Sequence, residues 1–243
     1  MKGPFEIQPA GSSLAGIDGL GEGTVPCPFN FTIVPGTEAE LALGALREDF
    51  PHMTPILFGN IKRAASLIRT IKMTIEPIDI LRQADRLDLE GWFAKRLHYL
   101  SERERLPRHG EWPDKAMSTS NLCTIMEIEG IFPTQVVIGL LPCAEHSAAP
   151  AYLRFGGWDD CPLPQVHVAL ARRWANSHGA VLVVGMSNTL EFRVSRPITT
   201  PEEAMELAVT HCLYNFDIMY QLGTIELVAA SLISSSAWQF WWD

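Results

Sequence analysis

The first part of the chain switches between alternating and helical hydrophobic patterns over short distances. Residues 29–34 alternate and are rich in β-branched side chains, and residues 54–58 form a short apolar run, so both predict strands. Thr37 stands three residues before Glu40, which is the spacing of a capping box at the start of a helix. The elements expected here are strands at 29–34 and 54–58 and helices at 37–47 and 61–71.

The middle of the chain shows the longest helical pattern. Leu89, Phe93, Leu97 and Leu100 recur at helical spacing with charged residues between them, so residues 76–108 are expected to be mostly helical. The elements expected after it are a polar loop at 107–115, strands at 125–128 and 136–141, and a linker of small residues at 142–150.

The last part contains the clearest start and stop signals. Residues 181–186 are continuously apolar, which is typical of a central strand. Thr200 followed by Pro201 and Glu203 combines a cap, a first-turn proline and a capping glutamate, and predicts a helix that runs to Gln221. The other elements expected are strands at 152–155, 190–194 and 237–242 and helices at 164–177 and 225–232.

Strands and helices that alternate along the chain favour the α/β class, and we expect a mixed sheet flanked by helices. The length of 243 residues suits one large domain. We divide it into a flexible lead-in at 1–28, an N-terminal α/β part at 29–149 and a C-terminal part of the same domain at 150–243, with a helical excursion at 60–115 inside the N-terminal part.

Charge and cysteine content narrow the class of protein. The chain has 28 acidic and 19 basic residues, a net charge of −9, which argues against a nucleic-acid partner. The sequence contains no run of 18 apolar residues, so no membrane span is expected. The five cysteines are an odd number without a Cys-x-x-Cys pair, which favours reduced thiols and a cytoplasmic location.

The charge is unevenly distributed along the chain. Residues 62–108 hold 11 of the 19 basic residues and 7 acidic ones, so this stretch is mildly positive and the rest strongly negative. A mixed charge run of this kind is usually the solvated face of a helix. The alternative is a site for a polyanion or an acidic partner.

Several unusual motifs follow one another in the C-terminal part. In this order and spacing they resemble the bacterial domain-of-unknown-function family 4253, over about residues 150–243. The resemblance implies no established activity. Two positions depart from the family, which commonly has asparagine at Asp159 and a cysteine-proline pair at Asn215-Phe216. The motifs are Phe155 to Pro162, Arg173-Trp174, His178-Gly179-Ala180, Thr189-Leu190-Glu191, Arg196-Pro197, Glu203-Ala204, Tyr214, Asp217-Ile218, Gln221 and Trp238 to Asp243.

Four carboxylates are candidate catalytic residues. Asp159 and Asp160 lie in a glycine-rich loop before a helix start, where α/β proteins often bind ligands. Glu191 and Asp217 lie among apolar residues, where a carboxylate has a raised pKa unless it is paired. The alternative for the loop is that its aspartates cap the helix and shape the turn. The alternative for Glu191 and Asp217 is a buried structural network in which Arg193 or Arg196 forms ion pairs with them.

Cys161 and several aromatic residues are candidate binding residues. Cys161 precedes a helix, which lowers a thiol pKa, and His167 or His178 could serve as its base. The alternative is a small buried side chain. The terminal tryptophans either wall a pocket or close a core. His211 is expected to be a hydrogen-bonded core residue. The binding candidates are Trp158, Cys161, Tyr214, Gln221, Trp238 and Trp241.

Two classes of function are compatible with these residues. The first is a non-catalytic protein-interaction module. Toxin-neutralising proteins are one type of such a module, suggested here only by their similar composition. The second is a small hydrolase that uses the four carboxylates, with or without a divalent metal. No metal ligands and no cofactor are assigned, and the partner is a protein or a small molecule, with no nucleic acid and no membrane. We expect Asp160, Asp217 and one terminal tryptophan to line a single cleft with the middle helices outside it.

Overall fold

The computed structural model describes residues 5–14, 25–71, 75–115, 118–122 and 133–243. The strand expected at 125–128 lies outside these ranges. The strands are β1 (Asn30–Val34), β2 (Thr54–Leu57), β3 (Val136–Leu141), β4 (Ala180–Gly185), β5 (Thr189–Val194) and β6 (Ala237–Trp241). The longer helices are α1 (Ala39–Asp49), α2 (Ile61–Thr70), α3 (Pro77–Asp85), α4 (Leu89–Glu102), α6 (Pro164–His178), α7 (Pro201–Tyr214) and α9 (Ile225–Leu232). The shorter ones are η1 (Gly36–Glu38), η3 (His146–Ala148), α5 (Ala149–Leu153) and α8 (Asp217–Leu222).

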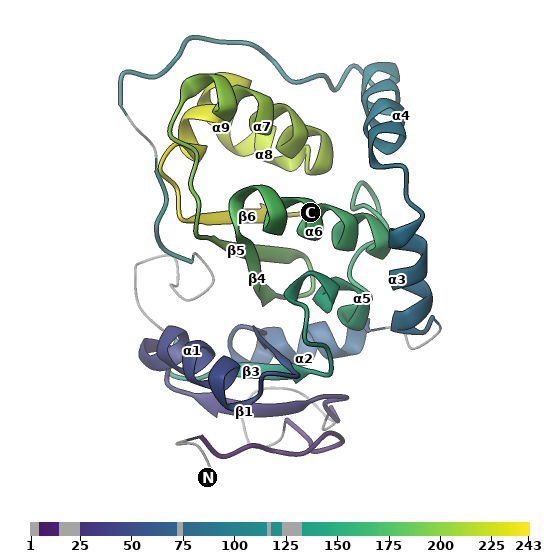
Figure 1. Ribbon diagram of the computed structural model, residues 1–243, viewed down its shortest axis with the longest axis vertical. Helices are drawn as coiled ribbons and strands as arrows, with labels where there is room; N and C mark the ends of the chain where they lie inside the picture. Colours follow the sequence, from purple (N-terminus) through teal and green to yellow (C-terminus); the bar gives the residue numbers. More distant parts are fainter. Residues whose placement is uncertain (1–4, 15–24, 72–74, 116–117, 123–132) are drawn as a thin grey trace.

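The strands form one six-stranded mixed sheet in the order β1-β3-β2-β4-β5-β6. The neighbouring strands are antiparallel except β2 and β4, which pair in parallel through Leu57 and Val184. The sheet runs from β1 near the N-terminus to β6, which lies beside α7, α8 and α9 (Figure 1). The α/β class and the mixed sheet expected from the sequence are therefore confirmed.

One strand of the N-terminal part joins the two parts of the chain. β2 lies between β3 and β4, so it separates two strands that belong to the C-terminal half of the sequence. Residues from about 136 onward therefore do not complete their sheet without β2. The N-terminal and C-terminal parts share one sheet, and side chains from both parts pack together on each of its faces.

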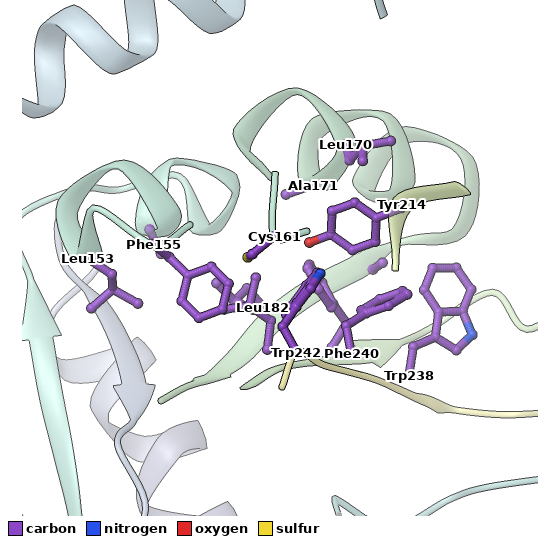
Figure 2. Packing of buried hydrophobic residues seen from close by; sticks show 14 of the residues in the cluster. Leu153, Phe155, Cys161, Leu170, Ala171, Leu182, Tyr214, Trp238, Phe240 and Trp242 are labelled. Carbon is purple, nitrogen blue, oxygen red and sulfur yellow. The ribbon is translucent and has the colours of Figure 1, made fainter. Parts of the chain in front are cut away.

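The larger core covers the face of the sheet beneath α2, α5, α6, α7 and α9. Trp174 on α6 lies at its centre, with its ring stacked on Phe240 at 5.2 Å and edge-on to Phe192, His211 and Tyr214. Figure 2 shows the neighbouring part of this core, where the buried rings of β6 lie beneath Tyr214. The smaller core lies on the opposite face, beneath α1. Helix α1 therefore covers part of the second face of the sheet.

Three expected elements are wrong, and the linker expected at 142–150 contains η3 and the start of α5. Thr37 lies inside the 3-10 turn η1, and α1 begins at Ala39 without a side-chain cap, so the capping box does not form. Residues 152–155 are not a strand, because α5 occupies Ala149–Leu153 and ends at Arg154 with a φ of 49°. The helix expected to run to Gln221 breaks after Tyr214, where Asn215 is extended and its amide donates to the Trp241 carbonyl at 2.8 Å.

The expected flexible lead-in, residues 1–28, is described over 5–14 and 25–28. Gln8 and Phe31 exchange two backbone hydrogen bonds, and Leu14 and Cys27 are buried in the larger core. These described residues therefore extend the sheet at its β1 edge. Among the described residues, no helix is long and apolar enough to cross a membrane.

The helical excursion packs against the C-terminal part through buried apolar side chains and through ion pairs at the surface. Arg172 and Arg173 on α6 pair with Asp85 on α3 and Glu90 on α4. Arg96, later on α4, reaches the backbone carbonyl of Leu213 at 3.1 Å. Helices α3 and α4 are therefore fixed on the outside of the C-terminal part.

Candidate functional site

The glycine-rich loop after α5 depends on left-handed backbone conformations. Gly156 has a φ of 104°, and a Cβ built there would lie 2.0 Å from the Pro162 carbonyl oxygen, so only glycine fits. Asp159 has a φ of 42° and its side chain is exposed. Asparagine and aspartate tolerate this conformation better than other residues. This accounts for aspartate at a position where the resembling family has asparagine.

Asp160 is enclosed by three side chains of the helical excursion. The Tyr99 hydroxyl donates to Asp160 Oδ1 at 2.8 Å, and Arg105 pairs with Oδ2. Arg96 Nη1 lies 3.6 Å from Oδ1, and its Nη2 donates to the Asp160 backbone carbonyl at 3.1 Å. Because both carboxylate oxygens accept from partners inside the chain, Asp160 ties the loop to α4 and the residues that follow it.

The electrostatics of Asp160 also fit an ion-pair role. Burial opposes ionisation, but the hydrogen bonds from Tyr99 and Arg105 and the charges of Arg105 and Arg96 outweigh it, so the pKa of Asp160 lies below its ordinary value. A carboxylate held ionised in this way is a weak base and a poor proton donor at neutral pH. The guanidinium of Arg105 also lies over the Phe216 ring at 4.8 Å.

Asp217 lies on the same side of the molecule as Asp160. Arg105 Nη2 is 4.0 Å from Asp217 Oδ1, and the backbone N–H of Asp243 donates to Oδ2 at 3.2 Å. Burial raises the pKa of Asp217. This effect is larger than the lowering by the Asp243 hydrogen bond and by the charge of Arg105, so the pKa lies above its ordinary value. The structure thus brings Asp160 and Asp217 together around Arg105. Arg105 is the cation near Asp217, so the alternative in which Arg193 or Arg196 pairs with the acids is wrong for Asp217.

Glu191 cannot join those two carboxylates. Its Oε1 accepts from Gln239 at 3.1 Å, and Gln239 alternates along β6 with Trp238 and Phe240, which face the larger core. Glu191 therefore lies on the opposite face of the sheet, where its neighbour Arg193 pairs with Glu40 of α1. The four predicted carboxylates do not converge on one point.

Cys161 is not an activated thiol. It is buried, and burial raises its pKa, so the lowering expected from the following helix start is wrong. Its Sγ lies 3.6 Å from Nε2 of the buried His167. That nitrogen also lies 2.9 Å from the Pro162 carbonyl, and Nδ1 lies 2.6 Å from the Tyr214 hydroxyl. A carbonyl only accepts, so Nε2 carries the proton and Nδ1 accepts from Tyr214.

This arrangement leaves His167 without a free nitrogen to act as the base for Cys161. Burial lowers the pKa of His167 to about 3, which keeps the imidazole neutral. Figure 2 shows the Tyr214 hydroxyl pointing toward the side of Cys161. The three side chains are therefore a buried structural network.

The described thiols are expected to resist alkylation in the native protein. Cys27, Cys143, Cys161 and Cys212 are free and buried. Burial raises the pKa of Cys27 and Cys143 to about 11 and that of Cys212 to about 12. Because the thiolate is the reacting form, iodoacetamide at neutral pH should label these four only after unfolding. Mass spectrometry of native and denatured samples measures this, and rapid native labelling of Cys161 would contradict the account.

The predicted aromatic residues fall into separate environments. Trp238 and Trp242 are buried in the larger core, so the terminal strand closes a core there. Trp241 is half-buried on the other face of β6, Trp158 packs edge-on to Phe155, and Gln221 is exposed. Across the described ranges, no group of three or more His, Cys, Asp or Glu side chains is arranged to hold a metal ion.

A groove of about 470 Å³ lies elsewhere, between α6 and α7. The buried side chains of Trp174, Ile198 and Leu207 form its floor. We call it the α6/α7 groove. The other side chains that line it are Arg173, Ser177, His178, Arg196, Pro197, Glu203, Glu206 and Thr210.

The charged side chains of the α6/α7 groove differ in how far they are already engaged. Arg173 pairs with Glu90, and Arg196 donates to the carbonyls of Ala175 and Asn176 at the end of α6. Glu203 and Glu206 have no ion-pair partner among the described residues. The groove therefore offers uncommitted carboxylates beside an apolar floor.

A buried histidine lies near this groove. The ring of His211 packs on Trp174, Trp238 and Phe240, and its buried Nε2 has no hydrogen-bond partner in the part of the chain that the structure describes. Burial and the nearby His178 lower its pKa to about 3, so it is a neutral core residue. The core position expected for His211 is confirmed, whereas its Nε2 lacks the expected hydrogen bond.

Sequence reasoning missed Tyr99, Arg96 and Arg105 as partners of Asp160. The signal was the excess of basic residues at 62–108 in an otherwise acidic chain. We interpreted that excess as a solvated face or a site for a polyanion or acidic partner. The structure shows instead that Arg96 and Arg105 pair with an acidic residue of the same chain, Asp160.

The fold and the carboxylate cluster define an α/β protein whose C-terminal part is held against a helical excursion. Residues 137–243 match the model of a family described as a domain of unknown function (DUF4253), which confirms the resemblance and begins it at β3. No curated protein and no solved structure matched the chain in the searches.

Proposed function

We propose that this protein is a non-catalytic protein-interaction module whose partner contacts the α6/α7 groove. The observation that carries the proposal is the combination of the apolar floor with the uncommitted carboxylates of Glu203 and Glu206. A surface of this kind suits a partner that covers the floor and pairs with the charges at the rim.

The positions of the other candidate residues also support this proposal. Asp160 binds Arg105 and Tyr99 within the chain, and Glu191 faces the opposite side of the sheet. Two of the four carboxylates that a hydrolase would use, Asp160 and Glu191, thus make internal contacts at separate places in the fold. We therefore do not carry the hydrolase alternative forward.

A variant with a blocked groove provides the test. Thr210→Arg places a long cationic side chain at the groove, whereas Val209→Arg places it at an exposed neighbouring position that does not line the groove. The tagged wild-type chain and the Val209→Arg variant should recover the same partner from cells. The Thr210→Arg variant should lose it by about tenfold or more, equivalent to about 1.4 kcal/mol of binding free energy.

Quantitative mass spectrometry of the recovered proteins measures this difference, with circular dichroism as the check that both variants are folded. Equal recovery of every protein by all three chains would mean that the α6/α7 groove is not the contact surface.

A further inference from the structure

We infer, building on the interaction module proposed above, that the α6/α7 groove binds an arginine or lysine side chain of the partner, with its cation held by Glu203 and Glu206. The whole chain carries a net charge of −9, so its field favours a basic partner segment. The specific argument rests on the two walls and the floor of the groove.

The α7 wall carries negative charge that the described part of the chain leaves without an ion-pair partner. Glu203 and Glu206 are three residues apart on α7, so their side chains project from the same face of the helix. Both are exposed and both line the groove. Two carboxylates at this spacing can accept charge-assisted hydrogen bonds from a single ammonium or guanidinium group.

The position of Glu206 on α7 does not serve to stabilise the start of the helix. Glu203 lies in the first turn of α7, where its carboxylate also stabilises the positive end of the helix dipole. Glu206 lies beyond that turn, where the effect of the dipole has fallen off. Its place in the groove is therefore not explained by the start of the helix.

The opposite wall cancels only part of this charge. Arg173 is neutralised by Glu90, whereas Arg196 keeps its positive charge while it donates to the carbonyl end of α6. Burial and the charge of Arg196 lower the pKa of His178 more than Glu203 raises it, so this side chain is neutral at pH 7. The two carboxylates of the α7 wall therefore outnumber the one unpaired cation opposite, and a cation that enters the groove meets a net negative charge.

The floor fits the apolar part of a basic side chain. The methylene stems of lysine and arginine pack on apolar surface while the charged end stays at a polar rim. Trp174, Ile198 and Leu207 offer that surface below Glu203 and Glu206. The volume of about 470 Å³ lies within the range of small-ligand pockets.

The experiment is a nuclear magnetic resonance titration of the full-length, nitrogen-labelled chain with acetyl-Ala-Arg-Ala-amide. The backbone amides of Leu207 and Thr210 and the indole N–H of Trp174 should shift, with a dissociation constant on the order of 1–10 mM. The control peptide acetyl-Ala-Gln-Ala-amide should cause little shift. Raising the salt from about 50 to about 300 mM should weaken the binding of the arginine peptide.

Matched variants locate the charge. Glu203→Gln combined with Glu206→Gln should weaken binding by about fivefold. Glu202→Gln changes a neighbouring exposed glutamate that does not line the groove, and binding should stay as in the wild type. The inference is overturned if the groove signals do not respond, if the glutamine peptide binds equally well, or if the double variant binds as tightly as the wild type. In those cases the interaction module still stands if Thr210→Arg loses the partner, and it fails separately if that variant does not.

Discussion

A chain that ends at Ala237 should fail to unfold cooperatively. The truncation removes Trp238, Phe240 and Trp242, which are all buried in the larger core, together with the strand that pairs with β5. Replacing one large buried aromatic residue by alanine costs about 3–5 kcal/mol. Three such losses equal or exceed the whole stability of an ordinary domain, about 5–15 kcal/mol. Denaturant unfolding followed by near-ultraviolet circular dichroism measures the effect.

Point variants keep this prediction measurable when the truncated chain does not fold. Phe240→Ala removes the ring stacked on Trp174 and should lower the free energy of unfolding by about 3–5 kcal/mol. Gln239→Ala changes the next residue of β6, which faces the other side, and should cost about 1 kcal/mol through its hydrogen bond to Glu191. A chain ending at Ala237 with the wild-type unfolding midpoint would show that β6 is an appendage.

Asp160→Asn should lower the free energy of unfolding by about 2–3 kcal/mol. The asparagine side chain lacks the negative charge that pairs with Arg96 and Arg105. Its N–H₂ group also replaces an oxygen that accepted hydrogen bonds, so two donors then face each other. Breaking a fully buried ion pair costs about 3–5 kcal/mol, and these side chains remain 11–26% exposed, so a smaller cost is expected. Asp159→Asn is the matched control, with a change within about 0.5 kcal/mol because Asp159 is exposed.

The pH dependence of this difference is a second readout. Because the fold lowers the pKa of Asp160, its stabilising contribution is present above the ordinary value of 3.8 and is lost as the pH falls through the lower value in the folded protein. The stability gap between wild type and Asp160→Asn should therefore be constant near neutral pH and shrink below pH 3.8. A gap that widens on acidification would contradict an ionised, paired Asp160.

Periodicity predicted the elements whose patterns are local. The continuous apolar run at 181–186 corresponds to the central strand β4, and the helices predicted at 164–177 and 225–232 match α6 and α9 closely. The wrong elements have competing local or tertiary causes. Residues 152–155 fit a strand pattern, but Pro150 in the first turn of α5 favours a helix start. The break at Asn215 depends on its hydrogen bond to Trp241, a contact that no local pattern encodes.

The site was only partly predictable for the same reason. The sequence placed Asp160 and Asp217 near each other through their loop and helix positions, and the structure brings both to Arg105. It could not show that Arg105, 55 residues before Asp160, is the shared partner. Strand alternation places Glu191 on the side of β5 away from Phe192, but which side faces the helices depends on packing.

The central claim is that a partner contacts the α6/α7 groove while the Asp160 cluster is structural. The most direct test places a photo-reactive benzoylphenylalanine at Ser177, an exposed residue that lines the groove, in one chain and at Val209 in another, and irradiates living cells that produce them. We predict one discrete cross-linked protein from Ser177, joined at a segment that contains arginine or lysine, and its absence from Val209. The same cross-linked products from both positions, or products from Val209 alone, would contradict the account.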